Sequence, residues 1–288
     1  MRRSPANTIA FQGQPGAYSD LACREVYPNL ATLPCASFEA AMAAVRDRRA
    51  RLAMLPIENS VAGRVADIHH LMPDSGLHII GEHFQRVNHH LLAPKGATLR
   101  TIKTVRSHVH ALNQCRTLIR TLRLKPIVVA DTAGAAAEVA ARGDPSEAAI
   151  ASALAGEIYK LATLKRDVED AEHNTTRFLA MSKTPRIAAA DGGICITTFV
   201  FRVRNVPAAL YKALGGFATN GVNMTKLESY MLGGRFYATQ FYADIEGHPS
   251  ERRVKLALEE LRFFSHEVKI LGVYPAHSFR LTAARGED

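Results

Sequence analysis

Short apolar runs alternate with helical patterns through the first 160 or so residues, and no other feature restricts the fold of this chain as strongly. The apolar runs are residues 8–13, 52–57, 101–107, 126–131 and 148–152. The segments after them carry apolar residues at helical spacing, from about Leu21, over 65–72, over 112–122, over 132–141 and over 153–162. A strand followed by a helix, repeated in this way, predicts an α/β sheet.

Small polar residues stand where these predicted strands end and the helices begin. They are Ser19, Asn59, Ser60, Ser107, His108, Thr132 and Ser152. Each can be an N-cap, since Ser, Thr, Asn and Asp are the preferred residue types there, and Ser152 is predicted to be only a cap. The ends of the strands in such a sheet share one edge, where helix N-termini present free N–H groups to a crevice. The row of hydroxyls therefore predicts a polar site for an anion.

The stretch AEHNTTRFLAMSK, residues 171–183, places two threonines and an arginine at the start of a segment that is predicted to be a buried strand. One interpretation is structural, with polar residues closing a turn, Arg177 in solvent and Phe178 in the core. The other is a site that contains Thr176 and Arg177. The residues alone leave both open.

The pattern changes after residues 183–193, KTPRIAAADGG, which have the composition of a linker. The segments that follow predict a strand over 194–205, a helix opened by Asn205 and Pro207 and closed by Gly221, strands over 223–231 and 235–247 around a Gly233-Gly234 turn, a helix opened by His248 and Pro249, and a strand over 266–274. This order is βαββαβ, a ferredoxin-like α+β domain.

The net charge of +9 and the pI of about 9.6 indicate an anionic partner, either nucleic acid or a small anion. The basic residues are scattered, with only short groups such as 46–51, so the sequence favours a small anion over nucleic acid. Four widely spaced cysteines predict reduced thiols and no metal site. Without an apolar signal segment or an apolar run of eighteen residues, the sequence predicts a cytosolic protein that neither spans a membrane nor is exported.

Five stretches, in order, resemble motifs of one family. They are GQPGAYSDLA at 13–22, PIENSVAGRV at 56–65, SHVHALNQC at 107–115, HNTTRFLAM at 173–181 and GVNMTKLES at 221–229. The whole chain resembles bacterial prephenate dehydratase, in which a catalytic domain precedes an ACT regulatory domain.

The resemblance implies a catalytic domain at 1–184, built of two α/β lobes like a periplasmic binding protein with the site in the cleft between them, and an ACT domain at 194–276. It implies that prephenate loses carbon dioxide and its ring hydroxyl to give phenylpyruvate. It implies no cofactor, and the sequence contains neither a Rossmann GxGxxG motif at a strand–helix turn nor a P-loop.

The resemblance implies catalytic roles for three residues of this chain. The family's essential threonine corresponds to Thr176, whose hydroxyl can donate a hydrogen bond to the departing oxygen. Arg177 suits a substrate carboxylate, because a guanidinium can bind one through two parallel hydrogen bonds. Glu58 is open to three interpretations, as an exposed turn carboxylate, as the group that orients Arg177, or as the acid in place of Thr176.

The predicted substrate-binding residues come from the same motifs. They are Asn59, Ser60, Ser107, Thr132, Phe178 and Ser19, with Phe178 as a wall of the pocket. His108 can be an acid or a structural residue at a helix start. Thr175 is expected to be a structural neighbour of Thr176.

ACT domains of this family pair side by side and hold phenylalanine through a Gly-Ala-Leu segment and a Glu-Ser-Arg-Pro segment. This chain has Ala208-Ala209-Leu210 and Glu228-Ser229-Tyr230-Met231 in their places. The predicted effector residues are Ala209, Leu210, Asn223, Met224, Glu228 and Ser229. The resemblance implies a homo-oligomer, a dimer or a tetramer, inhibited by phenylalanine.

Two other functions remain. Arogenate carries an amino group where prephenate carries a keto group, and the sequence does not separate the two substrates. A two-lobed cleft joined to an ACT domain can also serve as a non-catalytic amino-acid sensor. The intact run Thr176-Arg177-Phe178 argues against the sensor.

Overall fold

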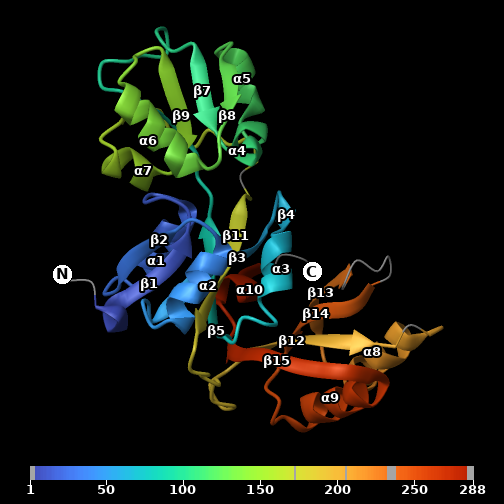
Figure 1. The fold of residues 1–288 in the computed structure, drawn as a ribbon. Helices are drawn as coiled ribbons and strands as arrows, with labels where there is room; N and C mark the ends of the chain where they lie inside the picture. Colours follow the sequence, from blue (N-terminus) through green and yellow to red (C-terminus); the bar gives the residue numbers. More distant parts are fainter. Residues whose placement is uncertain (1–3, 172, 205, 232–237, 284–288) are drawn as a thin grey trace. The chain divides into compact units, whose positions relative to one another are not determined.

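The computed structural model describes residues 4–171, 173–204, 206–231 and 238–283 (Figure 1). The chain forms two compact units. The first unit contains Met1–Ile68 and His83–Phe178, and the second contains His69–Glu82 and Leu179–Asp288.

The first lobe of the first unit is a sheet with the strand order β5-β11-β3-β1-β2, in which β1 is parallel to β2 and β3, and β4 is antiparallel to β3. Its strands are β1 (Thr8–Gln12), β2 (Ala31–Cys35), β3 (Leu52–Asn59), β4 (Gly63–Arg64), β5 (His78–Arg86) and β11 (Thr175–Ser182). Its helices are η1 (Pro5–Asn7), α1 (Tyr18–Val26), α2 (Phe38–Arg46) and the start of α3 (Ala66–Leu71). β3 is buried along most of its length, as its apolar run predicts.

The second lobe is a sheet with the order β10-β6-β9-β7-β8. Its strands are β6 (His90–Ala93), β7 (Thr104–Ser107), β8 (Lys125–Val128), β9 (Glu147–Ala151) and β10 (Ala162–Lys165), and its helices are α4 (Val109–Asn113), α5 (Arg116–Thr121), α6 (Thr132–Arg142) and α7 (Ala153–Ile158). Leu91 of β6 packs in one core cluster and Leu92 in another. Successive strand residues point to opposite faces, so both faces of this sheet are covered.

The second unit contains an antiparallel sheet with the order β13-β14-β12-β15, next to which β5 pairs with β15. Its elements are β12 (Cys195–Val203), α8 (Ala209–Thr219), β13 (Met224–Met231), β14 (Ala238–Glu246), α9 (Arg252–Phe264), β15 (Ser265–Pro275) and α10 (Ser278–Ala283). Helices α8 and α9 cover the same face of the sheet (Figure 1). Phe199 and Phe201 of β12 fill the core between the sheet and these helices.

The predicted fold class is confirmed, with a two-lobed α/β part like a periplasmic binding protein and a βαββαβ ferredoxin-like α+β part. Three details were wrong. The helix predicted over 112–122 is interrupted at Gln114 and Cys115, α8 begins at Ala209, and α9 begins at Arg252. The predicted Gly233-Gly234 turn and Asn205 lie outside the described residues.

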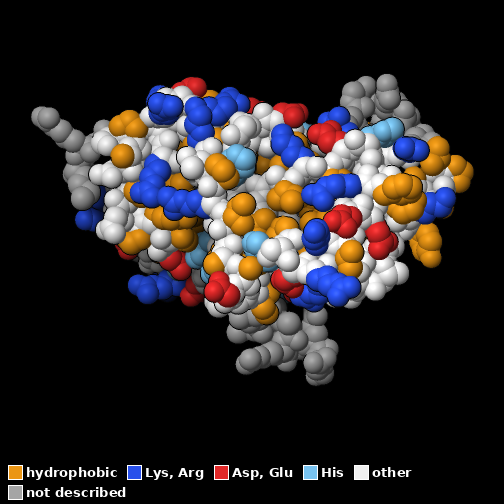
Figure 2. All heavy atoms as spheres, turned by 90° about the horizontal axis from the view of Figure 1, so that it is seen from below, with side chains coloured by type: hydrophobic (Ala, Val, Ile, Leu, Met, Phe, Trp, Pro, Cys, Tyr) orange, Lys and Arg blue, Asp and Glu red, His pale blue; other side chains and the backbone are white. Residues whose placement is uncertain are grey.

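Basic side chains are interspersed with acidic and apolar ones on the face drawn in Figure 2, as their scatter in the sequence predicts. All four cysteines are free thiols. None of the helices in the described part of the chain has the length and apolar character that crossing a bilayer takes.

Ala208 precedes α8 in the left-handed region, with φ of 62° and ψ of 13°. This residue stands where the family motif has glycine, and only glycine adopts this conformation without a steric penalty. We expect Ala208→Gly to raise the free energy of unfolding by about 1 kcal/mol. Urea unfolding followed by circular dichroism measures the change. Ala218→Gly, at an exposed helical position of α8, is the matched control and should lower stability.

Candidate active site

A cleft of about 580 Å³ lies in the first unit and is lined by residues of both lobes and of β11. The first lobe contributes Gln12, Gly13, Ala17, Tyr18, Ser19, Phe38, Pro56, Asn59, Ala62, Gly63, Arg64, Val65 and Asp67. The rest of the lining is Val87, His89, His108, His110, Ala111, Gln114, Ala130, Asp131, Thr132, Thr176 and Phe178. The volume suits a small metabolite.

Thr176 and Asn59 meet in this cleft. Asn59 is the last residue of β3, and its Nδ2 donates to Thr176 Oγ1 over 2.9 Å. Its Oδ1 accepts from the backbone N–H groups of Val61 and Ala62, over 3.0 and 2.7 Å. The end of β3 therefore positions the Asn59 amide, and the amide in turn holds the Thr176 hydroxyl.

Alternation along β11 separates Thr176 from Arg177. Thr176 and Phe178 line the cleft, whereas the Arg177 side chain is 2 % exposed and does not. Arg177 Nη1 lies 2.9 Å from Oε1 of Glu58, and the guanidinium is 6.0 Å from the ring centroid of Phe84. Glu58 also lies outside the lining. The structure thus brings Arg177 and Glu58 to each other and not to the cleft.

The predicted serines differ in where they lie. Ser19 lines the cleft, as do Thr132 and His108. Ser60 does not, because its hydroxyl donates to His173 O and accepts from Thr175 N, which ties the end of β3 to the start of β11. Ser107 is fully buried and donates to Ile150 O over 2.6 Å. Ser152 caps α7, as predicted.

Several lining residues escaped the sequence analysis. Arg64 follows the Glu-Asn-Ser motif, and a basic residue beside a predicted anion site was a signal for it. His89 and Gln114 carried no such signal. Burial and the nearby His110 lower the pKa of His108 in this lining, while Asp131 opposes this effect.

The predicted effector residues lie on two elements of the second unit. Ala209 and Leu210 begin α8, Met224, Glu228 and Ser229 belong to β13, and Asn223 precedes β13. Asn223 Nδ2 donates to Glu246 Oε2 over 3.1 Å, and Glu228 Oε1 lies 3.2 Å from Lys226 Nζ. Tyr230, which stands where the family motif has arginine, is buried and packs on His70.

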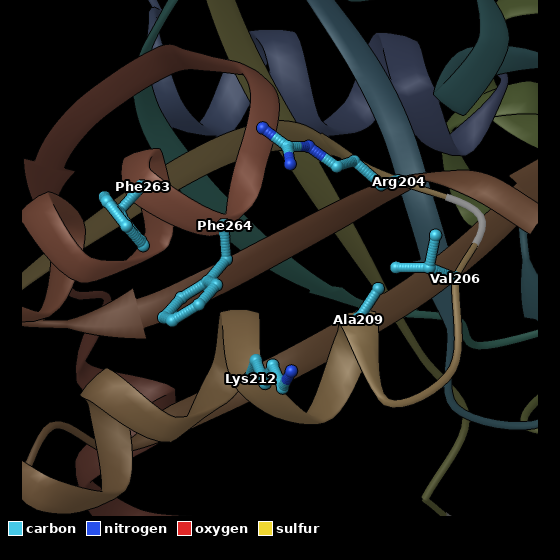
Figure 3. Close-up of a pocket in the computed structure, with 6 residues that line it drawn as sticks. All are labelled: Arg204, Val206, Ala209, Lys212, Phe263 and Phe264. Carbon is cyan, nitrogen blue, oxygen red and sulfur yellow. The ribbon is translucent and has the colours of Figure 1, made fainter.

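A smaller pocket of about 280 Å³ lies between α8 and the end of α9 (Figure 3). Its lining is Arg204, Val206, Ala209, Lys212, Phe263 and Phe264. Of the predicted effector residues, it contains only Ala209. Across the residues that the structure describes, no three His, Cys, Asp or Glu side chains are grouped to hold a metal ion.

Comparison with known proteins agrees with this geometry. The family model described as prephenate dehydratase matches residues 9–186. A bifunctional N-acyl-homoserine lactone acylase/prephenate dehydratase of Komagataeibacter europaeus is 57% identical over 94% of this chain and 97% of that protein. The chloroplastic arogenate dehydratase/prephenate dehydratase 1 of Arabidopsis thaliana is 38% identical over 93% of this chain and 71% of that protein.

Two solved structures are similar along almost their whole length. One is described as a novel type of quorum quenching acylase, with a TM-score of 0.89 and 56% identity over 95% of this chain and 99% of that one. The other is the prephenate dehydratase of Arthrobacter aurescens in complex with L-Phe, with a TM-score of 0.85 and 30% identity over 97% and 98%. The chain therefore belongs to the prephenate dehydratase family and is an enzyme of the dehydratase class, a carbon–oxygen lyase.

Proposed function

We propose that this enzyme converts prephenate into phenylpyruvate, carbon dioxide and water. The observation that carries the proposal is the Thr176 hydroxyl, which faces the cleft and is held there by Asn59. Phe178 adds an apolar wall for the ring of the substrate. The charge on Arg64 suits a dianionic ligand.

The reaction requires little covalent chemistry from the protein. The bond to the departing carboxylate breaks, its electron pair enters the ring, and the bond to the ring hydroxyl breaks as the ring becomes aromatic. The leaving oxygen gains negative charge and departs as water with a proton that the solvent supplies. Thr176 already accepts a hydrogen bond from Asn59, so its own hydrogen is available to that oxygen.

Arg177 and Glu58 have a positioning role in this proposal. Their ion pair lies behind β11, on the face opposite Thr176 and Phe178. This ion pair favours Glu58 as the group that orients Arg177 over Glu58 as the acid. The pair stabilises β3 and β11, the two strands that carry Asn59 and Thr176.

The test is purified protein incubated with prephenate, with phenylpyruvate measured by its ultraviolet absorbance in alkali. A parallel reaction with arogenate, analysed for phenylalanine, compares the two substrates. We expect kcat/KM to be higher for prephenate. A higher value for arogenate would assign the enzyme to the other substrate, and no product from either would refute the dehydratase proposal.

A lactone acylase activity is a second candidate, because the relative that is 57% identical over nearly the whole chain is described as having both activities. Incubation with N-acyl-homoserine lactones and mass spectrometry for released homoserine lactone tests it. The Thr176→Ala variant then shows whether the two activities depend on the same cleft residue.

We also propose control by phenylalanine in a homo-oligomer that pairs through the βαββαβ unit. The support is the Asn223 side chain beside Glu246, at the start of β13, where amide and carboxylate groups can hold the charged ends of an amino acid. Linkage requires the effect to be reciprocal: if phenylalanine weakens the binding of a substrate analogue by some factor, the analogue must weaken the binding of phenylalanine by the same factor.

Calorimetry with phenylalanine is expected to show binding to the parent protein and none to Asn223→Ala. Asn220→Ala, at the half-buried C-cap of α8, is the matched control and should bind normally. If Arg204→Ala loses binding and Asn223→Ala keeps it, phenylalanine occupies the pocket of Figure 3 instead. No binding to the parent protein at millimolar concentration would refute the proposal.

A further inference from the structure

Two acidic side chains line the cleft in addition to the cation of Arg64. They are Asp67 and Asp131. Asp67 lies in the first turn of α3 and is exposed, whereas Asp131 directly precedes α6 in the second lobe and is half-buried. Water screens a half-buried charge less than an exposed one. Asp131 is therefore the acid of this lining that acts more strongly on a bound substrate.

One carboxylate oxygen of Asp131 caps α6. Its Oδ1 accepts from the backbone N–H of Gly134 over 2.6 Å, which is the N-cap contact of this helix of 11 residues. The free N–H groups at the start of a helix also favour a negative charge beside them. The cap holds the side chain in one place, but it uses a single oxygen, and asparagine would supply that oxygen equally well.

The other oxygen, Asp131 Oδ2, has no hydrogen-bond or ion-pair partner within the described part of the chain. A Cβ at Gly134 would lie 3.0 Å from it, closer than an ordinary contact, so glycine lets the carboxylate lie against the first turn of α6. A charged oxygen that lines a cleft and has no protein partner is open to a ligand that donates hydrogen bonds.

The two candidate substrates differ at the group that a carboxylate distinguishes best. Arogenate carries an ammonium group, which is positively charged and can only donate hydrogen bonds. Prephenate carries a keto group at the same carbon, which can only accept them. A carboxylate therefore attracts arogenate at this position, whereas toward prephenate it offers no hydrogen bond and repels the two carboxylates.

We propose that Asp131 is a specificity residue that binds the amino group of arogenate, so that the cleft accepts the amino acid as well as the keto acid. Oδ1 continues to cap α6 while Oδ2 accepts from the ammonium group. A hydrogen bond between two charged groups is roughly twice as strong as one between neutral groups, which makes this contact a strong discriminator. The proposal deepens the proposed dehydratase function and rests on it.

Asp131→Asn tests the role of the charge. Asparagine keeps the size of the side chain and an oxygen for the Gly134 N–H, so α6 should stay capped. We expect kcat/KM for arogenate to fall by about tenfold or more, and kcat/KM for prephenate to stay the same or rise. Circular dichroism checks the fold. A fall by the same factor for both substrates would overturn the proposal.

Asp67→Asn is the matched control, because it removes the same charge from the same lining at an exposed position. It should change the ratio of the two kcat/KM values by less than about twofold. If both variants change this ratio equally, the overall charge of the cleft decides the preference and the assignment of Asp131 is wrong.

Binding separates this proposal from the dehydratase function. Calorimetry with arogenate on Thr176→Ala, the variant expected to turn over slowly, gives a Kd in the absence of rapid reaction. Adding Asp131→Asn should raise that Kd by about tenfold or more. An equal Kd, or no binding of arogenate to either variant at millimolar concentration, would overturn the proposal. If the parent protein turns over neither substrate but Asp131→Asn weakens arogenate binding, the dehydratase proposal has failed while the assignment of Asp131 stands.

Discussion

Replacement of Thr176 by alanine is expected to lower kcat for prephenate by about a hundredfold or more, the effect of removing one donor to developing negative charge. The side chain is small and faces the cleft, so the fold should persist. The measurement is the initial rate of phenylpyruvate formation, with circular dichroism as the check on folding.

Two variants serve as controls for this result. Thr176→Ser keeps the hydroxyl that Asn59 holds and should recover most of the activity. Thr175→Ala alters the neighbouring side chain, which does not line the cleft, and should be nearly as active as the parent protein. If Thr176→Ala turns over normally, the departing oxygen receives its hydrogen bond from another group, and His108 is the next candidate.

Arg177→Met is expected to lower the free energy of unfolding by about 3 kcal/mol, at the low end of the range for a broken buried ion pair. Methionine fills a similar space, so the loss comes from the charge and its hydrogen bonds. The Glu58 side chain would keep its position with only 31 % exposure while losing the guanidinium it pairs with. Urea unfolding measures the change.

Arg253→Met provides the matched comparison. Arg253 Nε lies 2.9 Å from Glu251 Oε2, the same distance as in the Arg177–Glu58 pair, but its side chain is half exposed. We expect this variant to lose less than about 1 kcal/mol. If Arg177→Met is as stable as the parent protein and its KM for prephenate rises sharply, Arg177 binds the substrate, as the motif resemblance implies.

The run Thr176-Arg177-Phe178 shows what the sequence could and could not predict about the site. The segment was predicted to be a strand, and adjacent residues of a strand point to opposite faces. Thr176 and Arg177 therefore could not both face one cleft from a regular strand. The motif resemblance directed attention to both, although the alternation was available in the sequence.

Long-range contacts explain the remaining differences. The alternating strands and helices were predictable because each depends on a local pattern. The break between α4 and α5 at Gln114 was not, since no glycine or proline marks it. Gln114 bonds to His89 and Asn174, residues distant in sequence. Ser60 and Ser107 had the right residue types for the cleft, but their hydroxyls are satisfied by backbone carbonyls.

The chain passes from one compact unit to the other three times. The reason is that residues 69–82 belong to the second unit, with the βαββαβ part, although more than a hundred residues of sequence separate them from it. In those residues, the Glu82 side chain is fully buried and accepts from Arg280 of α10 over 2.7 and 2.9 Å. A protein truncated within residues 183–194 would keep the Glu82 carboxylate and lose Arg280, the cation that it binds. A gene fusion that exchanged only the C-terminal segment would have the same effect if the new segment had no cation at position 280. A βαββαβ part exchanged between relatives therefore keeps this ion pair only if residues 82 and 280 change together.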